Sequence, residues 1–210
     1  MTYFPLFIDI KGRKCLLAGG GKVALRKVRT LLAYKADVQL IALSVDPELA
    51  ELLPEEAFRK GLLREDDLEG AALVVAATSS RDENHRIAML CHDRNIPVNV
   101  IDCPEECSFL FPAVVKRGDV SIGINTGARS PGLSRHIREQ IQEAVPEWYG
   151  DLADRIGEVR DELKGHVSDE AVRWRMLSEI LDRSLREERV LSREETREML
   201  NPLDYYGTIS

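Results

Sequence analysis

Cysteine is scarce in this sequence, and its spacing fits neither a disulfide framework nor a zinc site. The 210 residues contain four cysteines, and no two of them form a Cys-x-x-Cys pair. A secreted, disulfide-stabilised domain is therefore excluded, and reduced thiols in a cytoplasmic protein are expected. The four histidines share no metal-ligand spacing, so the sequence predicts no metal site.

Long apolar runs and an excess of basic residues are also missing. No stretch of about 18 apolar residues occurs, so no membrane-spanning helix is predicted. The N-terminus lacks the basic segment and the small-residue cleavage site of a signal peptide. Lys and Arg total 29 against 36 Asp and Glu, a net charge of −7, which argues against a protein that coats nucleic acid. Because hydrophobic residues make up 44% of the chain, it can form a folded core.

Strand-like and helix-like segments alternate over the first hundred residues. Short apolar runs predict buried strands at 14–18, 38–43, 73–77 and 97–101. An amphipathic helix is expected after the first strand, and Ser80 with Glu83 fits a capping box at the start of another. The segment 47–58 has a helical composition that Pro54 interrupts. This alternation predicts the α/β class, with a parallel sheet and right-handed crossovers.

The pattern changes after residue 102. Two β-rich runs, 109–115 and 119–125, are joined by three residues and predict a hairpin. Ser130 and Pro131 then fit the start of a helix, and nearly all of the chain after residue 146 has a helical pattern. We therefore place domain boundaries near residues 112 and 146.

A glycine-rich segment follows the first predicted strand and opens the first predicted helix. Gly19-Gly20-Gly21-Lys22-Val23-Ala24 fits the pattern G-x-G-x-x-A. In a dinucleotide site, such small residues allow a tight turn, a close approach of the pyrophosphate and close packing of the helix on the sheet. The phosphates then bind free N–H groups at the positive end of the helix. The alternative is an ordinary glycine-rich turn, but its position between strand and helix favours a Rossmann-type site.

The acidic residue that usually binds the ribose hydroxyls is missing. It normally lies about 20 residues after the loop, whereas the second strand here ends in Ala42-Leu43-Ser44 and the first acid is Asp46. No arginine stands nearby to bind a 2′-phosphate, so NAD is favoured over NADP. Main-chain groups and the Ser44 hydroxyl are the remaining candidates for holding the ribose.

Several linked motifs resemble one enzyme family. The loop, with Arg26-Lys27 after it, is similar to the glycine loop of siroheme synthases, and specifically to their precorrin-2 dehydrogenase module. The resemblance extends over roughly residues 1–145. Further matching segments are Pro5-Leu6-Phe7, Ala76-Ala77-Thr78, Pro97-Val98-Asn99-Val100-Ile101-Asp102, Ser108-Phe109-Leu110-Phe111-Pro112-Ala113 and Thr126-Gly127-Ala128-Arg129-Ser130-Pro131.

The resemblance implies a fold, an activity and a set of partners. It implies an NAD-binding Rossmann domain at 1–112, a dimerisation segment at 113–146 through which two chains form a homodimer, and a helical domain at 147–210. It further implies NAD-dependent oxidation of precorrin-2 to sirohydrochlorin in siroheme biosynthesis, a form of porphyrin biosynthesis. In some members of the family, insertion of ferrous iron follows. No methyltransferase module is seen, so the stand-alone form is expected.

The resemblance also assigns residues. Asp102 matches the catalytic aspartate. The resemblance implies NAD contacts at Lys22, Val23, Leu43 and Ser44. The glycine pattern adds Gly19, Gly20 and Gly21 to the expected cofactor-binding residues, and Thr78 is a further candidate. The residues expected to bind the tetrapyrrole are Asn99, Thr126, Arg129 and Ser130. The family's fused members carry a serine in the turn where Thr126 stands here, and the helices after residue 146 match no family motif.

Each assignment has an alternative. Asp102 can instead cap the turn beside Pro104, and Asn99, which we expect to face a wet cleft, can bond to backbone. The substrate is a polycarboxylate, so basic residues can form a rim for it or remain solvated surface charge. The candidates for this rim are Lys116, Arg117, Arg129, Arg135, His136 and Arg138. For the whole chain, the alternatives are an NAD(H)-binding regulatory or sensor module without catalysis, and a partner-binding helical domain on an inactive core.

Overall fold

The computed structural model describes residues 3–200, and these form two compact units. The first unit runs to Phe111 and includes Gly127–Arg129, and the second comprises Pro112–Thr126 and the described residues from Ser130 onward. The three-part division at residues 112 and 146 stays a prediction.

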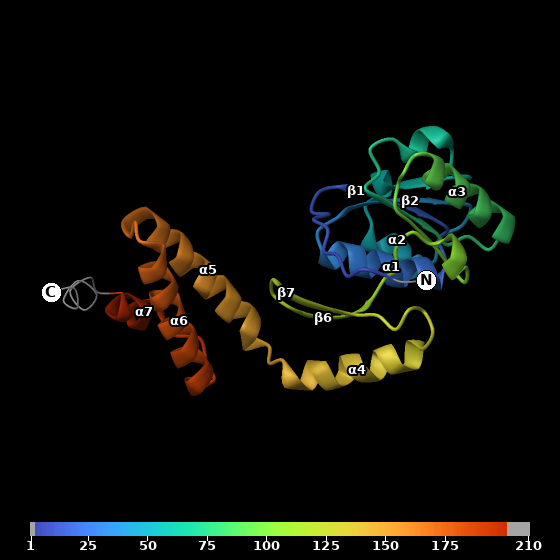
Figure 1. The fold of residues 1–210 in the computed structure, drawn as a ribbon. Helices are drawn as coiled ribbons and strands as arrows, with labels where there is room; N and C mark the ends of the chain where they lie inside the picture. The colour runs from blue at the N-terminus through green and yellow to red at the C-terminus, as the bar shows by residue number, and fades with distance from the viewer. Residues whose placement is uncertain (1–2, 201–210) are drawn as a thin grey trace. The chain divides into compact units, whose positions relative to one another are not determined.

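The first unit is built on a five-stranded sheet (Figure 1), and its strands are parallel, as predicted. The strands follow the order β3-β2-β1-β4-β5. Their bounds are Lys14–Ala18 for β1, Asp37–Ala42 for β2, Phe58–Lys60 for β3, Leu73–Ala76 for β4 and Val98–Val100 for β5. The sequence missed β3, because three residues with two charges among them carry no apolar run.

Helices cover both faces of this sheet. On one face lie α1 (Lys22–Ala33) and α2 (Pro47–Leu52), and on the other lies α3 (Arg81–Asp93). Helix α1 buries Leu25, Val28 and Leu31 against the sheet, and each large apolar side chain so buried contributes about 1.5–3 kcal/mol to stability. Short 3₁₀ turns span Glu55–Ala57, Glu65–Leu68 and Pro104–Glu106.

The capping box predicted at the start of α3 is only half formed. Ser80 Oγ accepts a hydrogen bond from the Glu83 N–H at 3.2 Å, as an N-cap should. The Glu83 carboxylate, however, pairs with Arg86 at 2.7 Å instead of returning to the Ser80 N–H. The predicted helix start is therefore confirmed, and the predicted bond from the Ser80 N–H to the Glu83 carboxylate is wrong.

The chain after Asp102 returns along the outer edge of β5. The Ser108 N–H donates to the Val98 carbonyl at 2.9 Å, and the Ser108 hydroxyl accepts from the Val98 N–H at 2.8 Å. Phe109 and Phe111 then pack against the core on the α1 face. The predicted hairpin strand therefore begins later than residue 109, because these two rings belong to the first unit. The returning segment also covers the exposed edge of the sheet.

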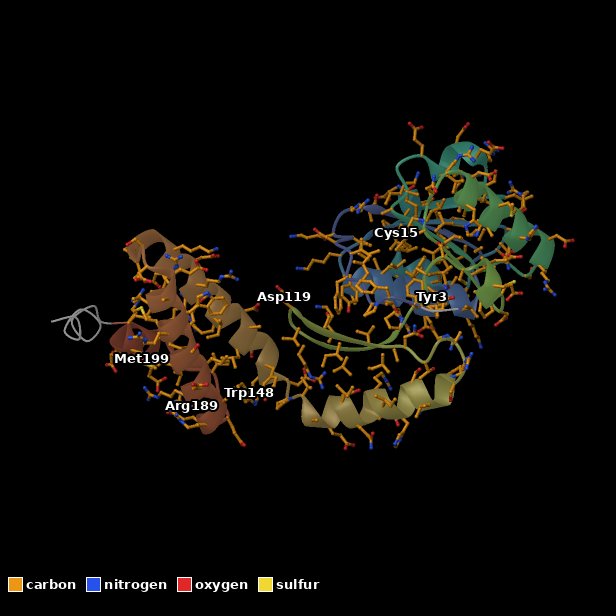
Figure 2. The ribbon with its side chains drawn as sticks, viewed as in Figure 1. Tyr3, Cys15, Asp119, Trp148, Arg189 and Met199 are labelled. Atoms are coloured by element: carbon orange, nitrogen blue, oxygen red, sulfur yellow. The ribbon has the colours of Figure 1, made fainter. Side chains whose placement is uncertain are left out.

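The second unit contains a hairpin and four helices. Strands β6 (Ala113–Arg117) and β7 (Val120–Ile124) pair antiparallel, and Asp119 lies at their turn (Figure 2). The helices are α4 (Pro131–Ala144), α5 (Trp148–His166), α6 (Glu170–Glu187) and α7 (Arg193–Met199). Val159, Leu163, Met176, Leu177, Ile180 and Leu191 form a core among the last three.

Candidate active site

The glycine loop is held between two neighbouring loops at the carboxyl end of the sheet. Gly19 has a φ of +110°, and a side chain there would overlap the Ala77 carbonyl. The Gly19 N–H donates to the Ile41 carbonyl at 2.8 Å. At Gly20 a Cβ would meet the Ser44 carbonyl, and the Gly20 carbonyl accepts from the Asp46 N–H at 2.8 Å. Both positions therefore require glycine for close backbone packing.

Gly21 needs to be small for a different reason. Apart from Gly21 and its two chain neighbours, no atom of residues 3–200 lies within 4 Å of the position that a Cβ would take there. Gly21 is the N-cap of α1, no side chain caps that end, and no acidic residue stands in the first turn. The N–H groups beginning at Lys22 and Val23 therefore present the positive end of a 12-residue helix beside free space. This arrangement fits the pyrophosphate of a dinucleotide, which the chain would bind with backbone donors.

The end of β2 shows why the usual ribose acid is absent. Asp46 Oδ1 accepts from the Glu48 N–H at 3.0 Å, so this carboxylate caps α2 and is not free for a ligand. Leu43 and Ser44 are exposed at the end of the strand, with Leu43 at 65% exposure. They remain the candidates for the adenosine side of the cofactor.

Thr78, at the end of β4, is fixed by a residue that the sequence motifs did not indicate. Asn84 is 5% exposed, and its Oδ1 accepts from the Thr78 N–H at 3.0 Å and from the Thr78 hydroxyl at 2.7 Å. Its Nδ2 donates to the Thr78 carbonyl at 3.2 Å. Asn84 thus fixes the loop that packs against Gly19. An asparagine four residues after an N-cap serine was the one signal that could have pointed to it.

Asp102 follows β5 with its carboxylate free. Its φ is +55°, a left-handed conformation that aspartate tolerates better than most residues. The side chain is exposed, and among residues 3–200 it has neither a hydrogen bond nor an ion pair. The following 3₁₀ turn, Pro104–Glu106, has Cys103 as its N-cap and receives no side-chain cap. The Asp102 carboxylate therefore does not cap this turn, which was the alternative role considered for it.

Asn99 bonds to backbone, the alternative considered for it, and most of its side chain is shielded from the wet cleft expected there. Asn99 is 6% exposed, and its Nδ2 donates to the Phe109 carbonyl at 3.1 Å and to Cys107 Sγ at 3.6 Å. Its side chain points to the α1 face because Val98 and Val100 fill the other face. Its Oδ1 has no partner among the described residues.

The cysteines are unpaired within the structure, as the sequence predicted. Cys15 lies on β1 in the middle of the first unit (Figure 2), where burial raises the pKa of its thiol to about 11. Burial has the same effect on Cys91. Cys107 accepts from the Val100 N–H at 3.1 Å, so its sulfur has a structural part in fixing the returning segment. None of these thiols has the lowered pKa of a reactive cysteine.

The remaining predicted substrate residues lie at the turn before α4. The Thr126 hydroxyl donates to the Ser130 carbonyl at 3.0 Å and contacts Ser134 Oγ at 2.9 Å. The Ser130 hydroxyl accepts from the Leu133 N–H at 3.3 Å and caps α4. Arg129 is exposed, with no ion pair among the described residues. The turn is thus well fixed internally, and Arg129 is its free cation.

The prediction that Arg117 belongs to the basic rim is wrong. Arg117 is 9% exposed, and its guanidinium donates to the carbonyls of Lys116, Gln142 and Val145 at 3.1–3.2 Å. It therefore satisfies the C-terminal carbonyls of α4, and its donors are not available to a substrate carboxylate.

Residues 3–200 contain neither a metal site nor a membrane-spanning helix. No group of three or more His, Cys, Asp or Glu side chains is placed to hold a metal ion in that range. None of the helices described there is both long enough and apolar enough to cross a membrane.

Comparison with known proteins places the chain in a family. Residues 6–113 match the family described as putative NAD(P)-binding. The chain belongs to this NAD(P)-binding family. The prediction that NAD is the cofactor is thereby confirmed, together with the Rossmann-type sheet.

The chain is also similar to proteins named siroheme synthase. It is 37% identical to that of Thioalkalivibrio sulfidiphilus over 87% of this chain and 38% of the relative. The corresponding values for Nitrosospira multiformis are 39% identity, 86% and 40%. The chain therefore spans about two fifths of the length of these relatives.

A solved structure matches nearly the whole chain. The protein named SirC, precorrin-2 dehydrogenase, superposes with a TM-score of 0.74 at 26% identity, covering 97% of this chain and all of that one. The predicted resemblance to the precorrin-2 dehydrogenase family is confirmed by these findings.

Proposed function

We propose that this chain oxidises precorrin-2 to sirohydrochlorin in siroheme biosynthesis, with NAD as the hydride acceptor. The names of the similar proteins support the pathway and the reaction. The observation that carries the proposal is the exposed, unpaired carboxylate of Asp102 at the sheet edge that holds the glycine loop.

The register of the sheet supports a common site. Ala18, Ala76 and Val100 lie in one row across β1, β4 and β5. Gly19 follows the first of these residues, and Asp102 stands two residues after the last. Two strand spacings separate β1 from β5, which is about 10 Å. Ligands of open α/β sheets bind at this carboxyl edge, so a nicotinamide and a substrate can lie between the loop and Asp102.

The chemistry needs a proton acceptor. Conversion of precorrin-2 to sirohydrochlorin removes two hydrogens, one as hydride and one as a proton, so the products are sirohydrochlorin, NADH and a proton. Bound NAD supplies the hydride acceptor. In our proposal the chain's backbone donors at Lys22 and Val23 hold the pyrophosphate, and Asp102 takes the proton or passes it to water.

Ferrous iron is a second proposed substrate. When Fe²⁺ enters sirohydrochlorin, the pyrrole nitrogens must lose their protons, and the same free carboxylate can receive them. In this proposal the macrocycle nitrogens coordinate the iron, and the chain supplies no resident metal site.

We also propose a homodimer formed through residues 113–146. Helix α4 has no fully buried residue, and Leu133 on its apolar stripe is 49% exposed. Ile137 and Ile141, on the same stripe, are only half-buried. A second copy of the chain would cover this stripe. Light scattering at micromolar concentration tests this, and a monomeric mass would contradict it.

One anaerobic experiment tests the function. The chain is incubated with precorrin-2 and NAD, and sirohydrochlorin absorbance is followed together with NADH formation. Equal amounts of both products support the dehydrogenase. NAD binding without any sirohydrochlorin would instead support a regulatory or sensor module. Addition of Fe²⁺ to the completed reaction then tests the chelatase, and failure to form siroheme would restrict the activity to dehydrogenation.

A further inference from the structure

Lys27 is a half-buried cation without a carboxylate partner. It lies on the second turn of α1, and its Nζ is 3.9 Å from the centroid of the Phe111 ring. Among residues 3–200, no acidic side chain lies within ion-pair distance of it. Lys14, by contrast, donates to the carbonyls of Asp67 and Glu69. Within that range, the Phe111 ring is the one partner of the Lys27 ammonium that the structure shows.

The groups around Lys27 leave a second polar atom unused. The Phe111 ring packs on Phe109 with centroids 5.2 Å apart, and the Phe109 carbonyl accepts from Asn99 Nδ2. The same Nδ2 donates to Cys107 Sγ, and Cys107 lies close enough to influence the charge of Lys27. The Asn99 Oδ1 accepts no hydrogen bond from any described residue, and it is not one of the side-chain atoms that are fully shielded from solvent. A cation and an accessible hydrogen-bond acceptor are thus both without a protein partner among the described residues of one cluster.

Burial makes the Lys27 charge unfavourable as the structure stands. It lowers the pKa of Lys27 to about 8 from 10.5, and the neighbouring Arg26 lowers it further while Cys107 opposes the shift. Tyr3 also faces Cys107, and burial raises the pKa of its hydroxyl. These groups supply no anion at neutral pH, and an ammonium in such surroundings gains most from a ligand that brings one.

We propose that Lys27 anchors a carboxylate of the tetrapyrrole substrate, with the Asn99 amide oxygen accepting from an N–H of the same ligand. The inference rests on the proposed function, since precorrin-2 and sirohydrochlorin carry both kinds of group. It adds a substrate-binding residue on α1 to the site around Asp102. The cluster belongs to the first unit alone, so the contact needs no particular placement of the second.

Two other roles for Lys27 predict different results in a binding experiment. Lys27 could serve only to pack on Phe111, in which case no ligand would depend on it. Alternatively, its anion could be a phosphate of NAD, because α1 also begins at the phosphate loop. The three cases differ in which ligand loses affinity when the charge is removed.

The variant Lys27→Met separates these cases, because methionine keeps much of the side-chain volume and removes the charge. We expect sirohydrochlorin to bind about 10- to 100-fold more weakly, as for loss of a charge-assisted hydrogen bond, with NAD affinity unchanged. Lys27→Arg should recover most of the binding. Arg26→Met, which removes the exposed cation next in sequence, is the matched control and should bind sirohydrochlorin normally.

Proton uptake gives an independent readout. An anion beside Lys27 raises its pKa, so wild type should take up protons when sirohydrochlorin binds at pH 8, and Lys27→Met should take up fewer. Calorimetry in two buffers of different ionisation enthalpy measures this difference. Equal sirohydrochlorin affinity in wild type and Lys27→Met would overturn the inference, and so would loss of NAD affinity instead. If wild type itself does not bind sirohydrochlorin, the proposed function fails and this inference fails with it.

Discussion

Asp46 and Asp102 both follow parallel strands at the same edge of the sheet, yet their carboxylates are used differently. Asp46 lies after β2 and caps α2 through the Glu48 N–H. Asp102 lies after β5 in a left-handed conformation and has no partner among the described residues. One acid is therefore part of the scaffold, and the other is presented to solvent where such sheets bind their ligands.

The same contrast extends to other polar groups of the first unit. Asn84 uses both ends of its amide to fix Thr78, whereas Lys27 has no counter-ion and Asn99 leaves its oxygen unpaired among the described residues. Groups that are satisfied internally should affect stability and loop geometry when removed. Groups that are left unsatisfied should affect ligands or chemistry. Variants of each kind therefore test this distinction.

Among the effects on binding and stability, the largest is expected at Gly21, which faces free space. Gly21→Asp places a negative side chain where the pyrophosphate should lie, and repulsion of several kcal/mol weakens NAD binding by about 100-fold or more. The protein should remain folded, because no described atom beyond the neighbouring residues in the chain stands within 4 Å of the added Cβ. Calorimetry with NAD measures the loss. Gly19→Ala is the contrasting variant and should unfold at lower temperature, and unchanged NAD affinity in Gly21→Asp would refute the phosphate-loop assignment.

Removal of the Asn84 clamp should have an intermediate effect. Asn84→Ala leaves the half-buried Thr78 N–H and carbonyl without their Asn84 partners, which lowers the free energy of unfolding by about 1–3 kcal/mol. The relaxed loop should also weaken NAD binding by about tenfold. Urea unfolding measures the first effect and calorimetry with NAD the second.

Ser184→Ala is the control for Asn84→Ala. Ser184 is equally buried and donates to the Ile180 carbonyl at 2.9 Å within α6. Its removal should lower stability without changing NAD affinity. Normal NAD binding by Asn84→Ala would show that Asn84 has no influence on the cofactor loop.

Lys27→Met should stabilise the protein in a pH-dependent way. Below pH 8 the half-buried ammonium is charged in both the folded and the unfolded state, so the whole cost of its desolvation lowers the free energy of unfolding. Between about 8 and 10.5 the unfolded chain binds the proton and the folded chain releases it, so wild-type stability rises with pH. The variant's advantage in thermal melting should therefore be largest at pH 7 and smaller at pH 10. A variant less stable than wild type at pH 7 would contradict this.

The smallest effect is expected at Asp46. Asp46→Ala removes one N-cap hydrogen bond and should lower the free energy of unfolding by about 1 kcal/mol. Its backbone bond to the Gly20 carbonyl does not depend on the side chain. Urea unfolding measures this loss of stability. The turnover of Asp46→Ala with precorrin-2 should stay near that of wild type. A large loss of turnover would mean that both acids of this edge take part in the reaction.

Much of the fold could be predicted because its signals are local. The apolar runs of β1, β2, β4 and β5 and the cap residues Ser80 and Ser130 all lie where the sequence indicated. The glycine loop was recognisable because its small residues are required by backbone contacts at fixed spacing.

What sequence could not reveal was which polar side chain meets which distant partner. In the sequence Asn84 is simply an amide on a helix, and its bonds to Thr78 become evident only when the structure places the loop beside it. Arg117 looked like a surface cation, and only the position of the α4 carbonyls shows that it is committed. Asn99 was expected to face water because alternation along a strand does not show what covers it, and here the returning segment does. Long-range packing decides all three.

The rate of sirohydrochlorin formation by Asp102→Asn, compared with Asp46→Asn, tests the central claim most directly. Both changes keep the shape of the side chain and remove its charge. If Asp102 accepts the proton, its variant should form sirohydrochlorin about 10²–10⁴-fold more slowly with NAD binding near normal, while Asp46→Asn stays within a few-fold of wild type. Equal rates for Asp102→Asn and wild type would show that the free carboxylate at the end of β5 takes no part in the reaction.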